Sequence, residues 1–163
     1  MPAWSWQVSE MQSPAESRVE NWIPHRGAMR LLDRILVVDE QQAVAEVDVP
    51  FDGLFVRDGA VPAWVGIEYM AQAVSAWAGG RGRRAGGQPR PGLLLGSRKY
   101  EAKCESFPSG ATLRVEAQCE LIAANGLGTF DCRITMDGRE VATARIAVFD
   151  PPAGTDLLRG STQ

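Results

Sequence analysis

Residues 61–80, VPAWVGIEYMAQAVSAWAGG, form the most apolar stretch of the chain. Apolar side chains occupy most faces of the helix that this stretch predicts, so the helix must be enclosed by other structure. Glu68 and Gln72 lie inside it, and a membrane span would resist an unpaired carboxylate at that depth. Pro62 suits a first-turn position, and the glycine pair at 79–80 is expected to end the helix. The stretch therefore predicts a buried helix over about 62–79 and no membrane span.

Extended segments flank this helix on both sides. Residues 29–40 and 43–50 come before it, are rich in aliphatic and β-branched side chains, and read as paired strands. Four more extended runs follow, separated by FPSG, ANGLG and the hairpin signal DG; they cover 93–104, 111–122, 128–136 and 140–149. Two strands, one enclosed helix and four strands predict an antiparallel sheet wrapped around a helix, an α+β domain.

The other segments are expected to add little to the core. A single domain over 18–150 fits a chain of 163 residues. Residues 1–17 are predicted to be a flexible N-terminal segment and 151–163 a disordered tail. SRVENWIP (17–24) carries a capping-box pattern and predicts a short helix, and GGRGRRAGGQPRPG (79–92) predicts a flexible loop.

Charge and cysteine content exclude several classes of function. The net charge is −3, and no basic stripe with interleaved aromatic residues suggests a nucleic-acid partner. Cys104, Cys119 and Cys132 have no metal-ligand spacing, and three cysteines cannot all pair internally. The first residues lack the basic start and apolar run of a secretory signal. We therefore expect a cytoplasmic protein with reduced thiols and no metal site.

Glu68 is the first residue with unexpected chemistry for its position. A carboxylate on an otherwise apolar helix costs free energy unless it is partnered or used. Burial would raise its pKa, whereas the nearby positive end of the helix dipole would lower it. Glu68 is either a structural carboxylate paired with a donor or a catalytic group.

His25, the only histidine in the chain, is the second such residue. Histidine exchanges protons readily near neutral pH, but a lone histidine at a strand entrance also serves as a hydrogen-bonded structural residue. Both interpretations remain open.

The arginines that follow the predicted helix are the third feature. Arg81, Arg83, Arg84 and Arg90 either belong to a solvated linker or form a landing patch for an acidic partner or a phosphate.

Three motifs in the same order resemble the β-hydroxyacyl-ACP dehydratases of fatty-acid synthesis. PHRGAMRLLDRIL resembles their Pro-His-Arg opening, VPAWVGIEYMAQAVSAWAG their central helix, and RKYEAKCESFPSGATLRVEA their strand, turn and following strand. The resemblance covers roughly residues 18–148. The helix sequence PAWVGIEYMAQ is most similar to that of the family branch found in aryl polyene and similar polyketide-type clusters.

This resemblance implies a hotdog fold, a sheet curled around one long helix, normally as a dimer. It also implies removal of water from a 3-hydroxyacyl group carried on acyl carrier protein. In the family, a histidine from one subunit works with the helix glutamate of the other, and backbone N–H groups near the helix start polarise the thioester carbonyl. Glu68 matches that glutamate. No cofactor is implied beyond the phosphopantetheine that carries the substrate.

The chain departs from the family at the catalytic histidine. The family has Gly-His-Phe-Pro where this chain has Gly53-Leu54-Phe55-Val56, so Leu54 takes the histidine's place. His25 matches a different histidine, which the standard mechanism does not require. Because leucine cannot transfer a proton, either His25 takes over the role, or Glu68 works with another donor, or this subunit lends structure to a partner.

The leading hypothesis is a 3-hydroxyacyl-ACP dehydratase with Glu68 and His25 as catalytic residues. The backbone N–H of Ala63 is the expected carbonyl polariser. The expected substrate-binding residues also include Leu54, Phe55, Trp64, Tyr69 and Gln72, and those expected to bind the carrier are Arg81, Arg83, Arg84, Arg98 and Lys99. The partners expected are an acyl carrier protein or coenzyme A thioester and a second hotdog subunit, in a homodimer or a heterodimer. A non-catalytic dimer partner and a hotdog acyl thioesterase are the alternatives.

Overall fold

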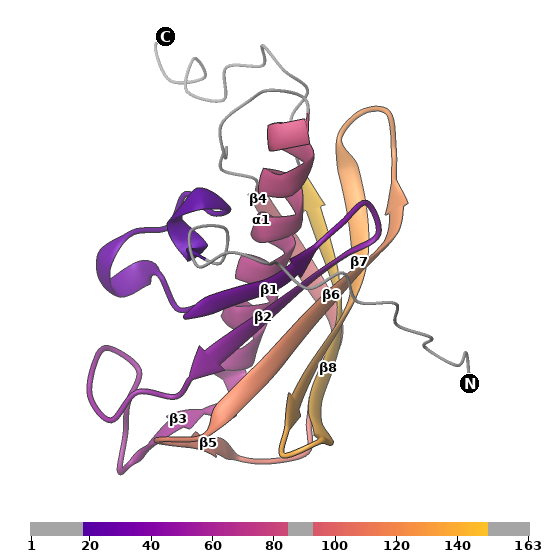
Figure 1. The fold of residues 1–163 in the computed structure, drawn as a ribbon. Coiled ribbons are helices and arrows are strands. Elements are labelled where there is room, and N and C mark those ends of the chain that lie inside the picture. The colour runs from indigo at the N-terminus through magenta and orange to yellow at the C-terminus, as the bar shows by residue number, and fades with distance from the viewer. Residues whose placement is uncertain (1–17, 85–92, 150–163) are drawn as a thin grey trace, which may run out of the picture.

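The computed structural model describes residues 18–84 and 93–149 (Figure 1). The segments predicted to be flexible at 1–17 and disordered at 151–163 lie outside the described residues, as does most of the predicted loop at 79–92.

The described elements follow the predicted order of strands, helix and strands. The strands β1 (Arg34–Val38) and β2 (Gln42–Asp48) come after two 3-10 turns, η1 (Val19–Asn21) and η2 (Gly27–Met29). A short strand, β3 (Ala60–Pro62), leads through the 3-10 turn η3 (Ala63–Val65) into the long helix α1 (Gly66–Arg84). The later strands are β4 (Leu93–Ala102), β5 (Ser106–Pro108), β6 (Thr112–Ile122), β7 (Leu127–Met136) and β8 (Arg139–Phe149).

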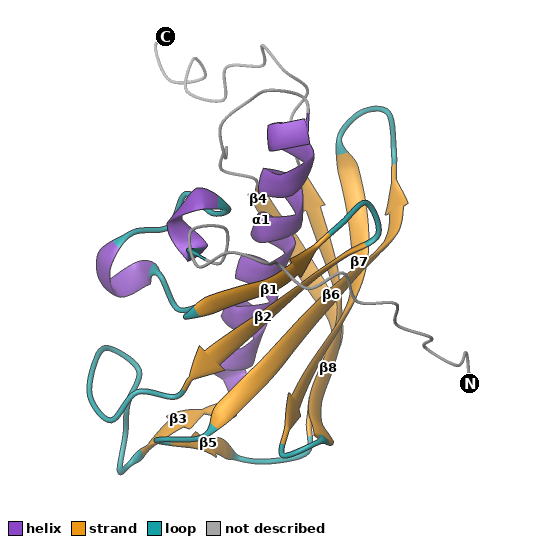
Figure 2. Ribbon diagram, viewed as in Figure 1, coloured by secondary structure: helices purple, strands orange, loops and turns teal. Residues whose placement is uncertain are grey.

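The main sheet has the strand order β1-β2-β6-β7-β8-β4, and all its neighbouring strands are antiparallel. It curves around α1, while β3 and β5 pair as a separate ribbon beside the start of the helix (Figure 2). The prediction of an α+β hotdog fold, one antiparallel sheet around one long helix, is confirmed. β1 and β4 are the two edges of this sheet.

The core lies between the concave face of the sheet and the helix. Alternate residues of β6, β7 and β8 are buried there, as the period of two along a strand requires. Trp77 of α1 packs edge-on against Phe130 of β7, with ring centroids 5.2 Å apart. In the described residues, no helix is both long and apolar enough to cross a membrane.

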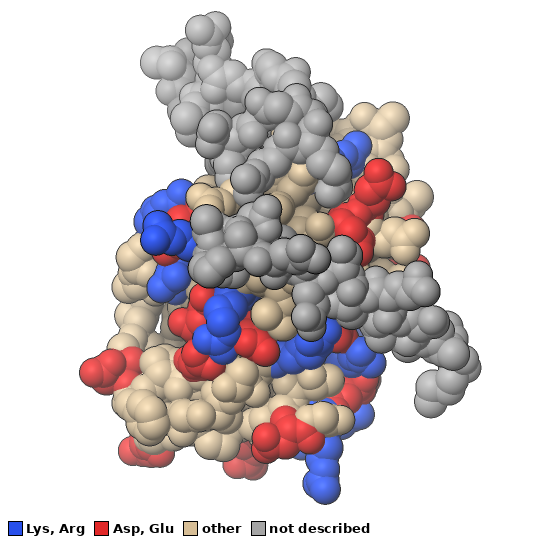
Figure 3. Space-filling model, in the orientation of Figure 1, with Lys and Arg blue, Asp and Glu red and all other residues tan. Residues whose placement is uncertain are grey.

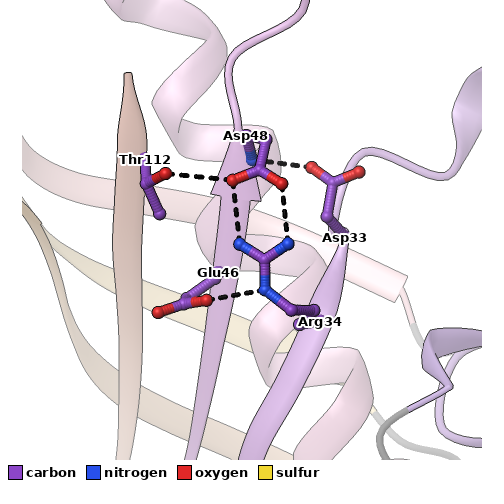
Figure 4. Close-up of polar contacts among 5 residues, drawn as sticks. All are labelled: Asp33, Arg34, Glu46, Asp48 and Thr112. Atoms are coloured by element: carbon purple, nitrogen blue, oxygen red, sulfur yellow. Dashed lines mark hydrogen bonds and ion pairs between the residues drawn. The ribbon is translucent and has the colours of Figure 1, made fainter. Parts of the chain in front are cut away.

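The opposite face of the sheet carries paired charges (Figure 3). Arg34 of β1 donates to Glu46 at 2.7 Å and to both carboxylate oxygens of Asp48 at 2.6 and 2.8 Å, and Asp33 accepts the backbone N–H of Asp48 (Figure 4). Thr112 of β6 joins the same network. The pairs of Arg34 and Arg145 link neighbouring strands, and together with Arg114–Glu116 within β6 they keep this face polar.

The predicted end of the helix at the glycine pair is wrong, because α1 continues to Arg84. Both glycines allow close packing instead. A Cβ on Gly79 would overlap the backbone carbonyl of Trp22, and one on Gly80 would overlap Val38. Glycine here removes steric obstacles between the helix and two neighbours, the segment before β1 and the end of β1 itself.

Several element boundaries also differ from expectation. The helix predicted over 17–24 is only the 3-10 turn η1, without a side-chain cap at Arg18. Pro62 ends β3 and has extended backbone angles (φ −56°, ψ 140°), so the helix proper begins later than predicted. The strand expected from residue 29 begins at Arg34 because η2 occupies its start.

Candidate functional site

Residues 18–33, here called the N-terminal arm, carry His25 across the side of α1. The Arg26 guanidinium donates to the backbone carbonyls of Ile23 at 2.6 Å, His25 at 2.8 Å and Glu20 at 3.0 Å. Ile23 itself is fully buried in the core. Arg26 therefore closes the turn that presents His25.

His25 faces Glu68, which lies in the first turn of α1. The imidazole Nε2 is 4.0 Å from the carboxylate Oε1, and the two side chains are 27% and 34% exposed. Burial lowers the pKa of His25 below its ordinary value, the Glu68 carboxylate raises it in part, and Arg26 lowers it again. The imidazole is therefore neutral near pH 7 and able to accept a proton. Its Nδ1 is buried without a hydrogen-bond partner among the described residues.

Gln72, one turn after Glu68, is completely buried, and its side chain forms hydrogen bonds both within the helix and to the arm. Its Nε2 donates to Glu68 Oε1 at 3.1 Å and to the Met29 carbonyl at 2.8 Å, and its Oε1 accepts the Leu31 N–H at 2.9 Å. The amide that was expected to bind substrate is thus occupied by protein groups. Gln72 instead orients Glu68 and ties the arm to α1.

The backbone at the start of the helix is held by two other segments. The N–H of Ala63, the expected carbonyl polariser, donates to the Glu105 carbonyl at 3.0 Å. The Ala63 carbonyl accepts a hydrogen bond from the Tyr100 hydroxyl of β4. The next N–H along the chain, that of Trp64, has no acceptor among the described residues. A polarising N–H at this helix start is therefore better assigned to Trp64 than to Ala63.

The remaining residues expected to bind substrate fall into two groups. Leu54 and Trp64 are 58% and 64% exposed, and Phe55 contacts Trp64 edge to face with ring centroids 5.9 Å apart. Tyr69 is buried in the core, tilted against Phe107 at 6.1 Å. The structure thus gathers Leu54, Phe55 and Trp64 into one apolar patch and places Tyr69 away from the surface.

The residues expected to bind the carrier also separate in the structure. Arg98 and Lys99 are exposed on the edge strand β4. Arg81 lies over the Trp77 ring at 5.8 Å, near the far end of α1. Arg83 and Arg84 belong to the last turn of α1, and their side chains lie outside the described set. In the described residues, no group of three or more His, Cys, Asp or Glu side chains could hold a metal ion.

Sequence reasoning missed the contribution of Tyr100. The stretch RKYEAK carries no local signal for it, because its partner lies 37 residues away on another element.

The antiparallel sheet curled around one enclosed helix defines a hotdog-fold protein. The family model for the ApeP dehydratase, named ApeP-like, matches residues 17–159, and the chain belongs to this family. A solved structure similar to it is the dehydratase heterocomplex ApeI:P from Xenorhabdus doucetiae, with 28% identity, a TM-score of 0.76, and coverage of 83% of this chain and 91% of that chain.

More distant structures share the fold alone. The TT0310 protein from Thermus thermophilus has 18% identity and a TM-score of 0.57 over 85% of this chain and 98% of that chain. A hypothetical thioesterase with coenzyme A from Streptococcus pneumoniae has 16% identity and a TM-score of 0.57 over 71% of this chain and 82% of that chain.

Proposed function

We propose that this chain is one subunit of a 3-hydroxyacyl thioester dehydratase and that it contributes the acid/base carboxylate, Glu68. The observation that carries this proposal is the environment of that carboxylate. Glu68 is partly exposed at the start of an otherwise enclosed helix, and buried Gln72 orients it. The carboxylate is thus oriented by the protein and still open to a substrate.

The other half of the site is proposed to come from a different hotdog subunit. In the dehydratases that this chain resembles, the histidine of one subunit faces the glutamate of the other. Leu54 holds the place of that histidine here, so a second copy of this chain would offer leucine to Glu68. A hotdog partner with the histidine would complete the site, and the similarity to the ApeI:P heterocomplex supports such pairing.

The edge strand β4 is the proposed contact with this partner. It has a strand on one side only, β8, and residues 94–99 are exposed. An unpaired strand edge is a template for pairing with another chain. The apolar patch of Leu54, Phe55 and Trp64 adds surface that a partner would cover.

The chemistry then divides among three groups. The partner's imidazole removes the α-proton of the 3-hydroxyacyl thioester, and Glu68 gives a proton to the departing hydroxyl. The carbon–hydrogen and carbon–oxygen bonds break, the 2,3 double bond forms, and water leaves. The Trp64 N–H stabilises the negative charge that develops on the thioester oxygen.

A second candidate is a homodimeric dehydratase in which His25 is the base. The 4.0 Å separation of His25 and Glu68 and the neutral state of the imidazole favour it.

The carrier and the location are part of the proposal. An acyl carrier protein presents an acidic surface and a phosphopantetheine phosphate, and Arg98 and Lys99 offer exposed positive charge on β4, the same strand that is proposed to contact the partner. The three cysteines are free thiols, which supports a reducing, cytoplasmic setting.

The test is mass spectrometry of 3-hydroxyacyl carrier proteins of several chain lengths. They are incubated with this chain alone and with a co-purified hotdog subunit that carries the histidine. Glu68→Gln should lower the rate of water loss ~10²–10⁴-fold, whereas the same change at exposed Glu120 should leave it unaltered. Sedimentation checks that the active species is larger than 17.7 kDa.

Each other outcome selects a different answer. Water loss by this chain alone, abolished by His25→Asn, supports the homodimer. Release of free thiol without an enoyl product identifies a thioesterase. Full activity of the complex with Glu68→Gln makes this chain a non-catalytic partner, and no reaction in any combination overturns the proposal.

A further inference from the structure

In the peptide group between Ala63 and Trp64, the carbonyl is hydrogen-bonded within the protein and the N–H is not, among the described residues. In a trans peptide the carbonyl and the N–H point in opposite directions. The carbonyl of this group, which belongs to Ala63, accepts the hydroxyl of Tyr100. Its N–H, which belongs to Trp64, has no acceptor among the described residues. The open donor therefore points away from Tyr100.

A local irregularity of β4 directs Tyr100 toward the helix. The pairing of β4 with β8 shifts register between Arg98 and Glu101, and Lys99 in this bulge has a positive φ of 55°. A bulge changes the direction of a strand's side chains. Arg98 and Lys99 remain exposed, while Tyr100 is partly buried against the start of the helix.

The helix provides space for the hydroxyl at Gly66. A Cβ at this position would overlap the Tyr100 oxygen and approach Ile134 at 3.1 Å and Phe107 at 3.3 Å. Burial raises the pKa of Tyr100 to about 12, so the hydroxyl keeps its proton and acts as the donor. On the other side of the residue, the bond from Ala63 N–H to Glu105 prevents the turn from rotating.

We propose that Tyr100 is a positioning residue that orients and polarises the Trp64 N–H toward the thioester carbonyl of an acyl substrate. This inference rests on the proposed dehydratase function. A hydrogen bond accepted by a peptide carbonyl strengthens the N–H of the same peptide group as a donor. Trp64 lies in the 3-10 turn η3, directly before α1, and Glu68 lies in the first turn of α1. The donor for the carbonyl and the carboxylate for the hydroxyl are thereby placed at the same end of α1.

The variant that tests this role is Tyr100→Phe, which removes the hydroxyl and keeps the ring. Loss of a direct oxyanion donor typically costs ~10²–10³-fold in kcat, and a donor that is only weakened should cost less, about 3- to 10-fold. KM should change less than about twofold because the ground-state thioester carries little charge on its oxygen. The matched control is Ile134→Val, which removes one methylene at the same contact with Gly66 and no hydrogen bond; its kcat should equal that of the wild type.

A second measurement does not depend on turnover. In the ¹H–¹⁵N spectrum of the protein, the Trp64 amide should shift upfield in Tyr100→Phe and remain in place in Ile134→Val. Wild-type kcat together with an unshifted Trp64 amide in Tyr100→Phe would overturn this inference alone. An equal loss of kcat in both variants would also overturn it, since packing would then be the cause. A wild-type complex that dehydrates no substrate would overturn the proposed function, whatever the amide shift.

Discussion

Replacing Gln72 with methionine should release the N-terminal arm from the helix. Methionine keeps a similar volume but cannot reproduce the three hydrogen bonds that Gln72 makes with Glu68, Met29 and Leu31. The carboxylate of Glu68 is partly exposed, so water can replace that bond. The two backbone bonds to the arm are partly buried. At about 1 kcal/mol each, with a further penalty for a group left unsatisfied, their loss should destabilise the protein by about 2–3 kcal/mol.

Urea unfolding followed by circular dichroism measures this loss. The matched control is Gln41→Met, the same change at an exposed glutamine, which should alter stability by less than about 0.5 kcal/mol. His25 supplies a second observable, because as the only histidine it gives a single imidazole signal in NMR. Its pKa lies below the ordinary value mainly because of burial, so it should rise toward 6.5 when the arm is released. Equal stabilities of the two variants, with an unchanged His25 titration, would refute the role of Gln72 as a clamp.

Three further predictions concern stability. The pKa of His25 is lowered in the folded state, so the unfolded chain binds the proton first and stability falls as the pH drops below about 6.5. His25→Asn should reduce this loss of stability. The same dependence of the melting temperature on pH in both proteins, between about pH 7 and 5, would contradict the prediction. Gly66→Ala should destabilise the protein by about 1–3 kcal/mol in denaturant, since its Cβ overlaps the Tyr100 hydroxyl, and an unchanged midpoint would count against that contact. Glu116→Leu removes the buried carboxylate that Arg114 and Arg133 both contact on the outer face and should cost about 1–3 kcal/mol; a more stable variant would show that the ion pairs do not offset their desolvation.

The elements of the fold could be predicted because each has a local signal. Runs of aliphatic and β-branched residues between turn signals predict the strands, and apolar side chains on most faces of the helix predict that it is enclosed. Glu68 was recognisable for the same reason, as a carboxylate out of place on an apolar surface. The structure brings it close to His25 as expected, and the catalytic role of both residues remains a prediction.

The features that sequence reasoning missed depend on contacts between distant segments. Gly79 and Gly80 have the composition of a helix end, yet they are small because Trp22 and Val38 approach the helix there. The hydrogen bond from the Tyr100 hydroxyl to the Ala63 carbonyl depends on a bulge in β4 and on how the helix packs against that strand. No local sequence pattern predicts such contacts between distant residues, because they depend on how the strands pair and pack.

The arm is anchored to the helix at two separate places, by Gln72 near Glu68 and by the glycine pair beside Trp22 further along α1. Because the arm also carries His25, a side chain added at Gly79 would push on the same segment that faces Glu68. In a mutational scan scored by activity, Gly79 would therefore resemble a residue of the active site, although it lies about three helical turns away from Glu68. Variants that probe the exposed patch of Leu54, Phe55 and Trp64 should therefore keep the glycine pair, because a side chain at Gly79 would disturb the arm as well.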